Sequence, residues 1–154
     1  MKTQMRKVLT AVTVKNYAYP SHFDLSLVDA GVAADFRKHE KDICEIADYF
    51  LRHPEAGYGF VSLGNNEQIV IQYDLKLGGA EAAIRRFFLD SPYWMTIEVD
   101  RLGVGFDFCN TQDAQSYLHI DFSYFDDYTD EDRENITLTK LAPYWTYGDH
   151  GAPI

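Results

Sequence analysis

The chain has 154 residues, a formal net charge of −10, and 46% hydrophobic and 15% aromatic residues. This composition excludes a disordered chain and suffices for one domain with its own core. The negative charge argues against nucleic acid or an anionic membrane as a direct ligand, because both require lysine and arginine. Cys44 and Cys109 follow no disulfide or metal spacing, and no apolar run is long enough to span a bilayer. We therefore expect reduced thiols in a cytoplasmic protein without cofactor or metal.

The first half of the chain predicts two strands followed by a long helix. Residues 7–15 and 22–28 alternate apolar and polar side chains, which is typical of a β-hairpin. A helix is expected from about Asp29 to His53, where Pro54 ends it. Its inner face is predicted to carry Val32, Phe36, Ile43, Ala47, Phe50 and Leu51, and its outer face Asp35, Lys38, Lys41, Asp42, Glu45 and Asp48.

The middle of the chain repeats this order before a strand meander begins. Residues 58–63 and 68–75 flank the turn signal Gly64-Asn65-Asn66 and predict a second hairpin. A shorter helix should follow, with a buried stripe of Ala83, Ile84, Phe87 and Phe88, and should stop at Ser91-Pro92. Later strands are predicted at Trp94–Asp100, Val104–Cys109, Tyr117–Ser123 and Ile136–Leu141, and residues 142–154 are expected to be an aromatic C-terminal tail.

The order of these elements predicts the fold class. Short connections between consecutive strands force antiparallel pairing. We expect an α+β domain over residues 1–154, with a single antiparallel sheet of about six to eight strands and two helices packed on one face.

Most of the negative charge lies between Tyr93 and Glu134, where eleven carboxylates and two arginines give a net charge of −9. With a period of two, the strands of this stretch separate into two faces. One face should be core and holds Met95, Ile97, Val99, Val104, Phe106, Phe108, Leu118, Ile120 and Phe122. The opposite face should hold Trp94, Thr96, Glu98, Asp100, Asp107, Cys109, Tyr117, His119, Asp121 and Ser123.

This polar face favours binding of a basic protein, because many like charges and a few rings provide both attraction and contact area. The loop that follows, FDDYTDEDRE, interleaves tyrosines with carboxylates and continues the acidic surface. The predicted partner-binding residues are Glu98, Asp100, Asp107, Tyr117, His119, Asp121, Tyr124, Asp126, Asp127, Tyr128, Asp130, Glu131 and Asp132.

The acidic surface resembles that of two groups of small inhibitors: immunity proteins that neutralise a nuclease toxin, and phage proteins that block a nucleic-acid-targeting defence system. The resemblance implies a non-enzymatic inhibitor of a basic nuclease or nucleic-acid-binding complex, whose carboxylates replace phosphates. One alternative is a small-molecule-binding or hydrolytic enzyme that uses His119 with Asp121, Asp107 and Glu98. Another is that the acidic surface only keeps the protein soluble.

Overall fold

The computed structural model describes residues 20–91, 93–100, 103–109, 115–121 and 137–149; for 109, 115–121, 137–138 and 149 it describes the backbone alone. The predicted strand at residues 7–15 lies outside these ranges. The helices are α2 (Ala30–Arg52) and α3 (Glu81–Asp90), with short 3-10 turns η2 (Pro54–Ala56), η3 (Asn65–Glu67) and η4 (Gly78–Ala80). The strands are β1 (Gly59–Leu63), β2 (Ile69–Tyr73), β3 (Trp94–Asp100), β4 (Gly103–Cys109), β5 (Gln115–Asp121), β6 (Thr137–Ala142) and β7 (Trp145–Asp149).

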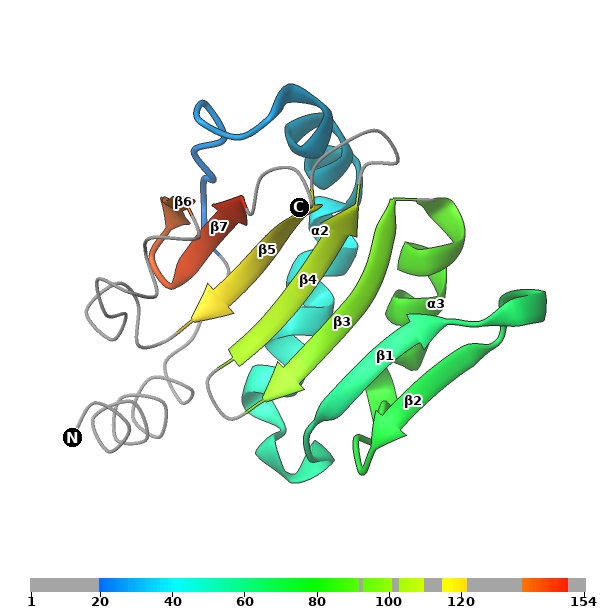
Figure 1. Ribbon diagram of the computed structural model, residues 1–154. Coiled ribbons are helices and arrows are strands. Elements are labelled where there is room, and N and C mark those ends of the chain that lie inside the picture. The colour runs from blue at the N-terminus through cyan, green and yellow to red at the C-terminus, as the bar shows by residue number, and fades with distance from the viewer. Residues whose placement is uncertain (1–19, 92, 101–102, 110–114, 122–136, 150–154) are drawn as a thin grey trace.

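Within the described ranges the strands form one sheet in the order β2-β1-β3-β4-β5-β7-β6, and each neighbouring pair is antiparallel. Helices α2 and α3 both lie behind this sheet in Figure 1. The opposite side of the sheet, here called the open face, has no described helix over it. The predicted α+β class, with two helices and an antiparallel sheet, is confirmed.

Helix α2 begins where its cap is best satisfied. The Asp29 side chain accepts hydrogen bonds from the backbone N–H groups of Gly31 and Val32, which lack partners inside the helix. The six side chains predicted for the inner face are all buried. The four predicted for the inner stripe of α3 are buried as well. Both helical predictions are therefore confirmed, because an apolar stripe at helical spacing is stable only against a core.

The prediction of a strand at residues 22–28 was wrong. This segment runs along the core as irregular chain, with Phe23 and Leu25 buried and one backbone bond from Asp24 to the Leu141 carbonyl. The Asp24 carboxylate accepts bonds from both the backbone N–H and the hydroxyl of Ser26. This local turn competes with a strand ladder and leaves Leu27 79% exposed.

The predicted aromatic tail, residues 142–154, contains strand β7, which lies between β5 and β6. A tight turn at Pro143 and Tyr144 reverses the chain, with Tyr144 in the left-handed region at φ 70°. Trp145 and Tyr147 then become core side chains, and Trp145 packs edge-on against Phe23. The prediction of a tail over residues 145–149 was wrong: these residues pair as a strand and 145–148 are buried, but their alternation covers too few positions to identify a strand from sequence.

Strand β3 departs from its predicted face assignment at its first residues. Trp94 was expected on the polar face and Met95 in the core, but Trp94 is buried and Met95 is 52% exposed. The pairing register between β3 and β4 shifts between Trp94 and Thr96, as in a β-bulge. An extra residue reverses the side-chain alternation on one side of the bulge. From Ile97 onward the predicted faces hold.

The buried thiol of Cys44 lies in α2 and forms no disulfide. Burial, followed by the carboxylates of Glu40 and Asp48, raises its pKa to about 12. Such a thiol packs as a small apolar group. None of the helices in the described ranges combines the length and apolar character needed to cross a membrane.

Candidate functional site

Three of the predicted carboxylates lie on the open face. Glu98 and Asp100 alternate with the core residues Ile97 and Val99 along β3, and Asp107 occupies the neighbouring strand β4. Pairing across the sheet places Glu98 opposite Phe60 of β1 on one side. These carboxylates are only partly exposed. The described part of the acidic stretch therefore presents charge on a surface that is partly desolvated.

Glu98 is the carboxylate most affected by this environment. Burial raises its pKa above the ordinary value, and the neighbouring negative charges of Asp100 and Asp107 raise it further. Asp100 is held in place, because its Oδ1 accepts a hydrogen bond from the Gly103 backbone N–H at 3.1 Å. A positive charge at this position would relieve the repulsion among the carboxylates.

Beside Glu98 the surface is hollowed, with a volume of about 420 Å³. We call this feature the sheet hollow; it is lined by Tyr58, Gly59, Phe60, Tyr73, Asp74, Glu98, Val99 and Asp100. Three aromatic rings and three carboxylates thus border one space. Its volume is within the range of about 300–1,000 Å³ that is usual for ligand pockets.

The walls of the sheet hollow are fixed by the ends of the β1–β2 hairpin. The Tyr58 backbone N–H donates to Asp74 Oδ1 at 3.4 Å, and the Lys76 N–H donates to the Ala56 carbonyl at 2.8 Å. Gly59 permits the close approach of the two strands, because a Cβ there would lie 2.1 Å from the Gln72 carbonyl oxygen. The hairpin therefore brings Tyr58 and Asp74 together although sixteen positions separate them in sequence.

Tyr73 ends β2 in an unusual conformation. Its φ of 70° is in the left-handed region, which tyrosine rarely adopts, and its side chain is 81% exposed. The ring lies against Phe60, with centroids 5.9 Å apart and planes inclined by 48°. A strained residue that presents a ring beside a hollow is a reason to look for function there.

The sequence predicted part of this site. Glu98, Asp100 and Asp107 lie together on the open face as expected. Tyr117, His119 and Asp121 belong to β5, where the backbone of His119 pairs with Gly105 of β4, but their side chains are outside the description. A role for His119 in an enzyme remains a prediction. The other predicted residues also lie outside the described ranges: Tyr124, Asp126, Asp127, Tyr128, Asp130, Glu131 and Asp132.

The sequence did not predict that aromatic residues would line the sheet hollow. Phe60 could have been assigned to the open face by alternation with the buried Val61, but Tyr58, Tyr73 and Asp74 could not. These three come together only through the register of the hairpin and the conformation of Tyr73.

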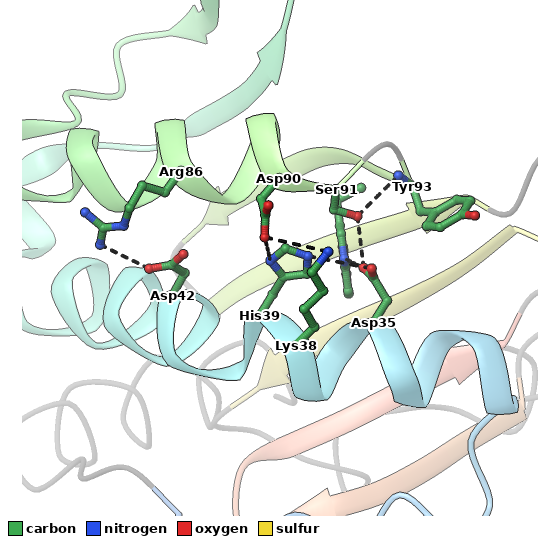
Figure 2. A network of polar contacts seen from close by, with 9 residues as sticks. Asp35, Lys38, His39, Asp42, Arg86, Asp90, Ser91 and Tyr93 are labelled. Carbon is green, nitrogen blue, oxygen red and sulfur yellow. Dashed lines mark hydrogen bonds and ion pairs between the residues drawn. The ribbon is translucent and has the colours of Figure 1, made fainter.

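A second polar group, here called the Asp35 cluster, lies between the two helices and comprises Asp35, His39, Asp90, Ser91 and Trp94 (Figure 2). Asp35 was expected on the outer face of α2, but its side chain is only 11% exposed. It accepts hydrogen bonds from the Ser91 hydroxyl at 3.0 Å and from the Trp94 indole N–H. His39 is 2% exposed and lies 3.6 Å from Asp35 and 3.7 Å from Asp90.

The Asp35 cluster contains serine, histidine and aspartate, but not in the arrangement of a nucleophilic triad. The Ser91 hydroxyl donates to Asp35 instead of contacting His39, so the imidazole is not placed to take its proton. Ser91 is itself buried. The contacts instead connect α2 to the end of α3 and the start of β3, which is a structural role.

No group of three or more His, Cys, Asp or Glu residues within the described ranges could hold a metal ion. Comparison of the chain with protein-family models, with curated proteins and with solved structures found no match in any of the three.

Replacing Glu98 with glutamine is expected to increase the free energy of unfolding at pH 7 by less than about 1 kcal/mol, since the side chain is partly exposed. The native-state pKa of Glu98 is raised above its ordinary 4.5. The contribution of Glu98 to the free energy of unfolding is therefore fully present below pH 4.5, where the carboxyl group is protonated. It is lost as the pH rises through the native pKa, because ionisation is less favourable in the folded protein. Urea unfolding measured from pH 4 to 8 should show that the free energy of unfolding of the variant exceeds that of the unmodified protein by an amount that grows with pH. Glu67→Gln, an exposed change in the turn between β1 and β2, is the control; an advantage that is constant with pH would contradict the prediction.

Proposed function

We propose that this protein is a non-enzymatic inhibitor that binds a basic, nucleic-acid-handling protein through the open face of its sheet. The observation that carries the proposal is the gathering of Glu98, Asp100 and Asp107 on a partly desolvated surface beside the sheet hollow. The net charge of −10 attracts a basic surface at a distance and repels nucleic acid.

The carboxylates suit this role because they lie on strands of the sheet and not on flexible loops. Charges on rigid strands need little ordering when a partner binds, so less of the interaction energy is spent on immobilisation. Repulsion among the three carboxylates is present in the free protein and is relieved when lysine or arginine side chains approach. Binding would then compete with phosphate groups for the same basic side chains.

The test is capture of partners from a lysate on the full-length chain at about 0.05 M and 0.5 M salt, which differ strongly in screening length. We expect a basic protein that is retained at low salt and released at high salt, and whose binding to nucleic acid is lost as this protein is added. A neutral or acidic partner, or retention that does not depend on salt, would contradict the proposal.

Two variant baits locate the surface. The first carries Glu98→Gln, Asp100→Asn and Asp107→Asn and is expected to capture much less of the partner. The second carries Glu40→Gln, Glu67→Gln and Glu81→Gln on α2, η3 and α3, and changes the net charge by the same amount. Equal losses with both baits would mean that net charge alone, and not the open face, determines binding.

A further inference from the structure

We propose that the sheet hollow receives one arginine side chain of the basic partner. This inference rests on the proposed function and assigns its central contact. The hollow combines the faces of Tyr58, Phe60 and Tyr73 with the carboxylates of Asp74, Glu98 and Asp100. Neither an apolar ligand nor an anion matches that lining, whereas a cation with flat faces matches both parts.

The rings provide the first part of the argument. Cations bind over aromatic faces, and arginine does so more often than lysine because its planar guanidinium also stacks. Tyr58 is 48% exposed and Tyr73 still more so, and the Phe60 and Tyr73 rings are tilted relative to each other instead of being stacked face to face. Ring surface is therefore accessible at the hollow, which is unusual for side chains that could have been buried in a core.

The carboxylates provide the second part. The five N–H donors of a guanidinium lie at its edge, so that a stacked arginine can still donate to carboxylates at the border of the ring surface. Glu98 lies directly across from Phe60 in the sheet. Within the described residues, the Asp74 carboxylate accepts one long hydrogen bond, from the Tyr58 backbone N–H. The Glu98 carboxylate makes no hydrogen bond or ion pair with the described part of the chain. Its charge is thus partly desolvated and directed at the place where the guanidinium would lie.

The hollow is also preformed. The Tyr58–Asp74 and Lys76–Ala56 bonds close the hairpin, and the left-handed backbone of Tyr73 sets its ring beside Phe60 in the free protein. A preformed site avoids the cost of ordering side chains on binding. A volume of about 420 Å³ is large enough to admit one arginine side chain.

The probe is N-acetyl-arginine amide, titrated into the full-length protein and followed by amide shifts in NMR spectra. N-acetyl-citrulline amide, which has nearly the same shape without the charge, is the matched control. We expect the arginine probe to shift the amides of Tyr58, Phe60 and Glu98, and the citrulline probe to bind at least roughly tenfold more weakly, as loss of a charge-assisted contact implies. Tetramethylammonium should bind more weakly than arginine, since it cannot donate hydrogen bonds.

Three variants test the lining: Tyr58→Leu and Phe60→Leu remove a ring but keep an apolar side chain, and Glu98→Gln removes the charge. Each substitution is expected to raise the dissociation constant of the arginine probe by up to roughly tenfold, the effect of losing one cation–π or carboxylate contact. Tyr93→Leu is the control, because Tyr93 is also partly exposed but contacts Phe108 away from the hollow. Amide spectra of each variant establish that the fold is retained.

Equal binding of arginine and citrulline, shifts located outside the hollow, or equal effects of Tyr58→Leu and Tyr93→Leu would overturn the inference. Tighter binding of tetramethylammonium than of arginine would also overturn it and assign the hollow to a small quaternary ammonium ligand. If the protein captures a basic partner in a salt-sensitive way but its hollow binds no arginine probe, this inference is wrong and the proposed function stands. Probe binding without any basic partner would remove the proposed function and leave an arginine site.

Discussion

Asp35→Ala is expected to lower the free energy of unfolding by about 2–6 kcal/mol, because it leaves two buried donors without their acceptor and each such donor costs about 1–3 kcal/mol. Asp35 accepts bonds from the Ser91 hydroxyl and the Trp94 indole, and it lies 3.6 Å from the ring of the buried His39. Alanine would leave both donors buried without their acceptor, at the point where α2 joins the start of β3. Urea unfolding followed by tryptophan fluorescence measures the loss, because Trp94 reports on the site directly.

The matched control is Asp42→Ala on the same helix. The Asp42 side chain is 19% exposed, but its partner Arg86, at 3.1 Å, is 57% exposed, so the ion pair is open to solvent. Removing a surface pair of this kind costs about 1 kcal/mol or less. Asp35→Asn, which keeps one acceptor oxygen, should fall between the two. If Asp35→Ala were no more destabilising than Asp42→Ala, the Asp35 cluster would not be holding the helices to the sheet.

The helices could be read from the sequence because their positions are decided locally. Val32, Phe36 and Ile43 recur at the helical period, and Asp29 supplies a cap at the observed start of α2. The exception is Asp35, which local spacing placed on the outer face. It turns inward because Ser91 and Trp94, more than fifty positions away, present donors to it. A long-range partner of this kind leaves no trace in the periodicity of α2.

The strands were less predictable where tertiary contacts override alternation. The bulge after Trp94 exchanges the faces of Trp94 and Met95, and a one-residue shift of this kind has no strong local signal. Strand β7 has only five residues, and its alternation is limited to the rings of Trp145 and Tyr147 with Thr146 and Gly148, so the pattern is too short to distinguish a strand from an aromatic tail. At 22–28 the pattern of a strand was present, but the Asp24 turn prevented pairing.

The candidate site divides in the same way. Alternation within β3 placed Glu98 and Asp100 on one face of the sheet, and charge counting selected that face. The hollow itself could not be predicted, because it depends on the register between β1 and β3 and on the positive φ of Tyr73. The sequence thus predicted the charge of the surface but not its shape.

Glu98→Lys is expected to weaken binding of the partner by about 2–5 kcal/mol, or roughly 30-fold or more, as when a buried interfacial charge pair is broken. The new ammonium group would lie across the strand pair from Phe60, beside Asp100 and Asp107, and would occupy the position proposed for the partner's guanidinium. It would repel the partner's basic side chains as well. Because the contact is short-range, surface plasmon resonance should register the loss mainly as faster dissociation.

Glu67→Lys provides the control, since it makes the same change in net charge in the exposed turn η3, at the end of the β1–β2 hairpin that lies away from Tyr58 and Asp74. Long-range attraction is reduced equally by both substitutions, so the association rate should fall by a similar small factor in each. Only Glu98→Lys should raise the dissociation rate. Equal dissociation rates in the two variants would place the interface away from the sheet hollow, on acidic residues that attract the partner without contacting it closely.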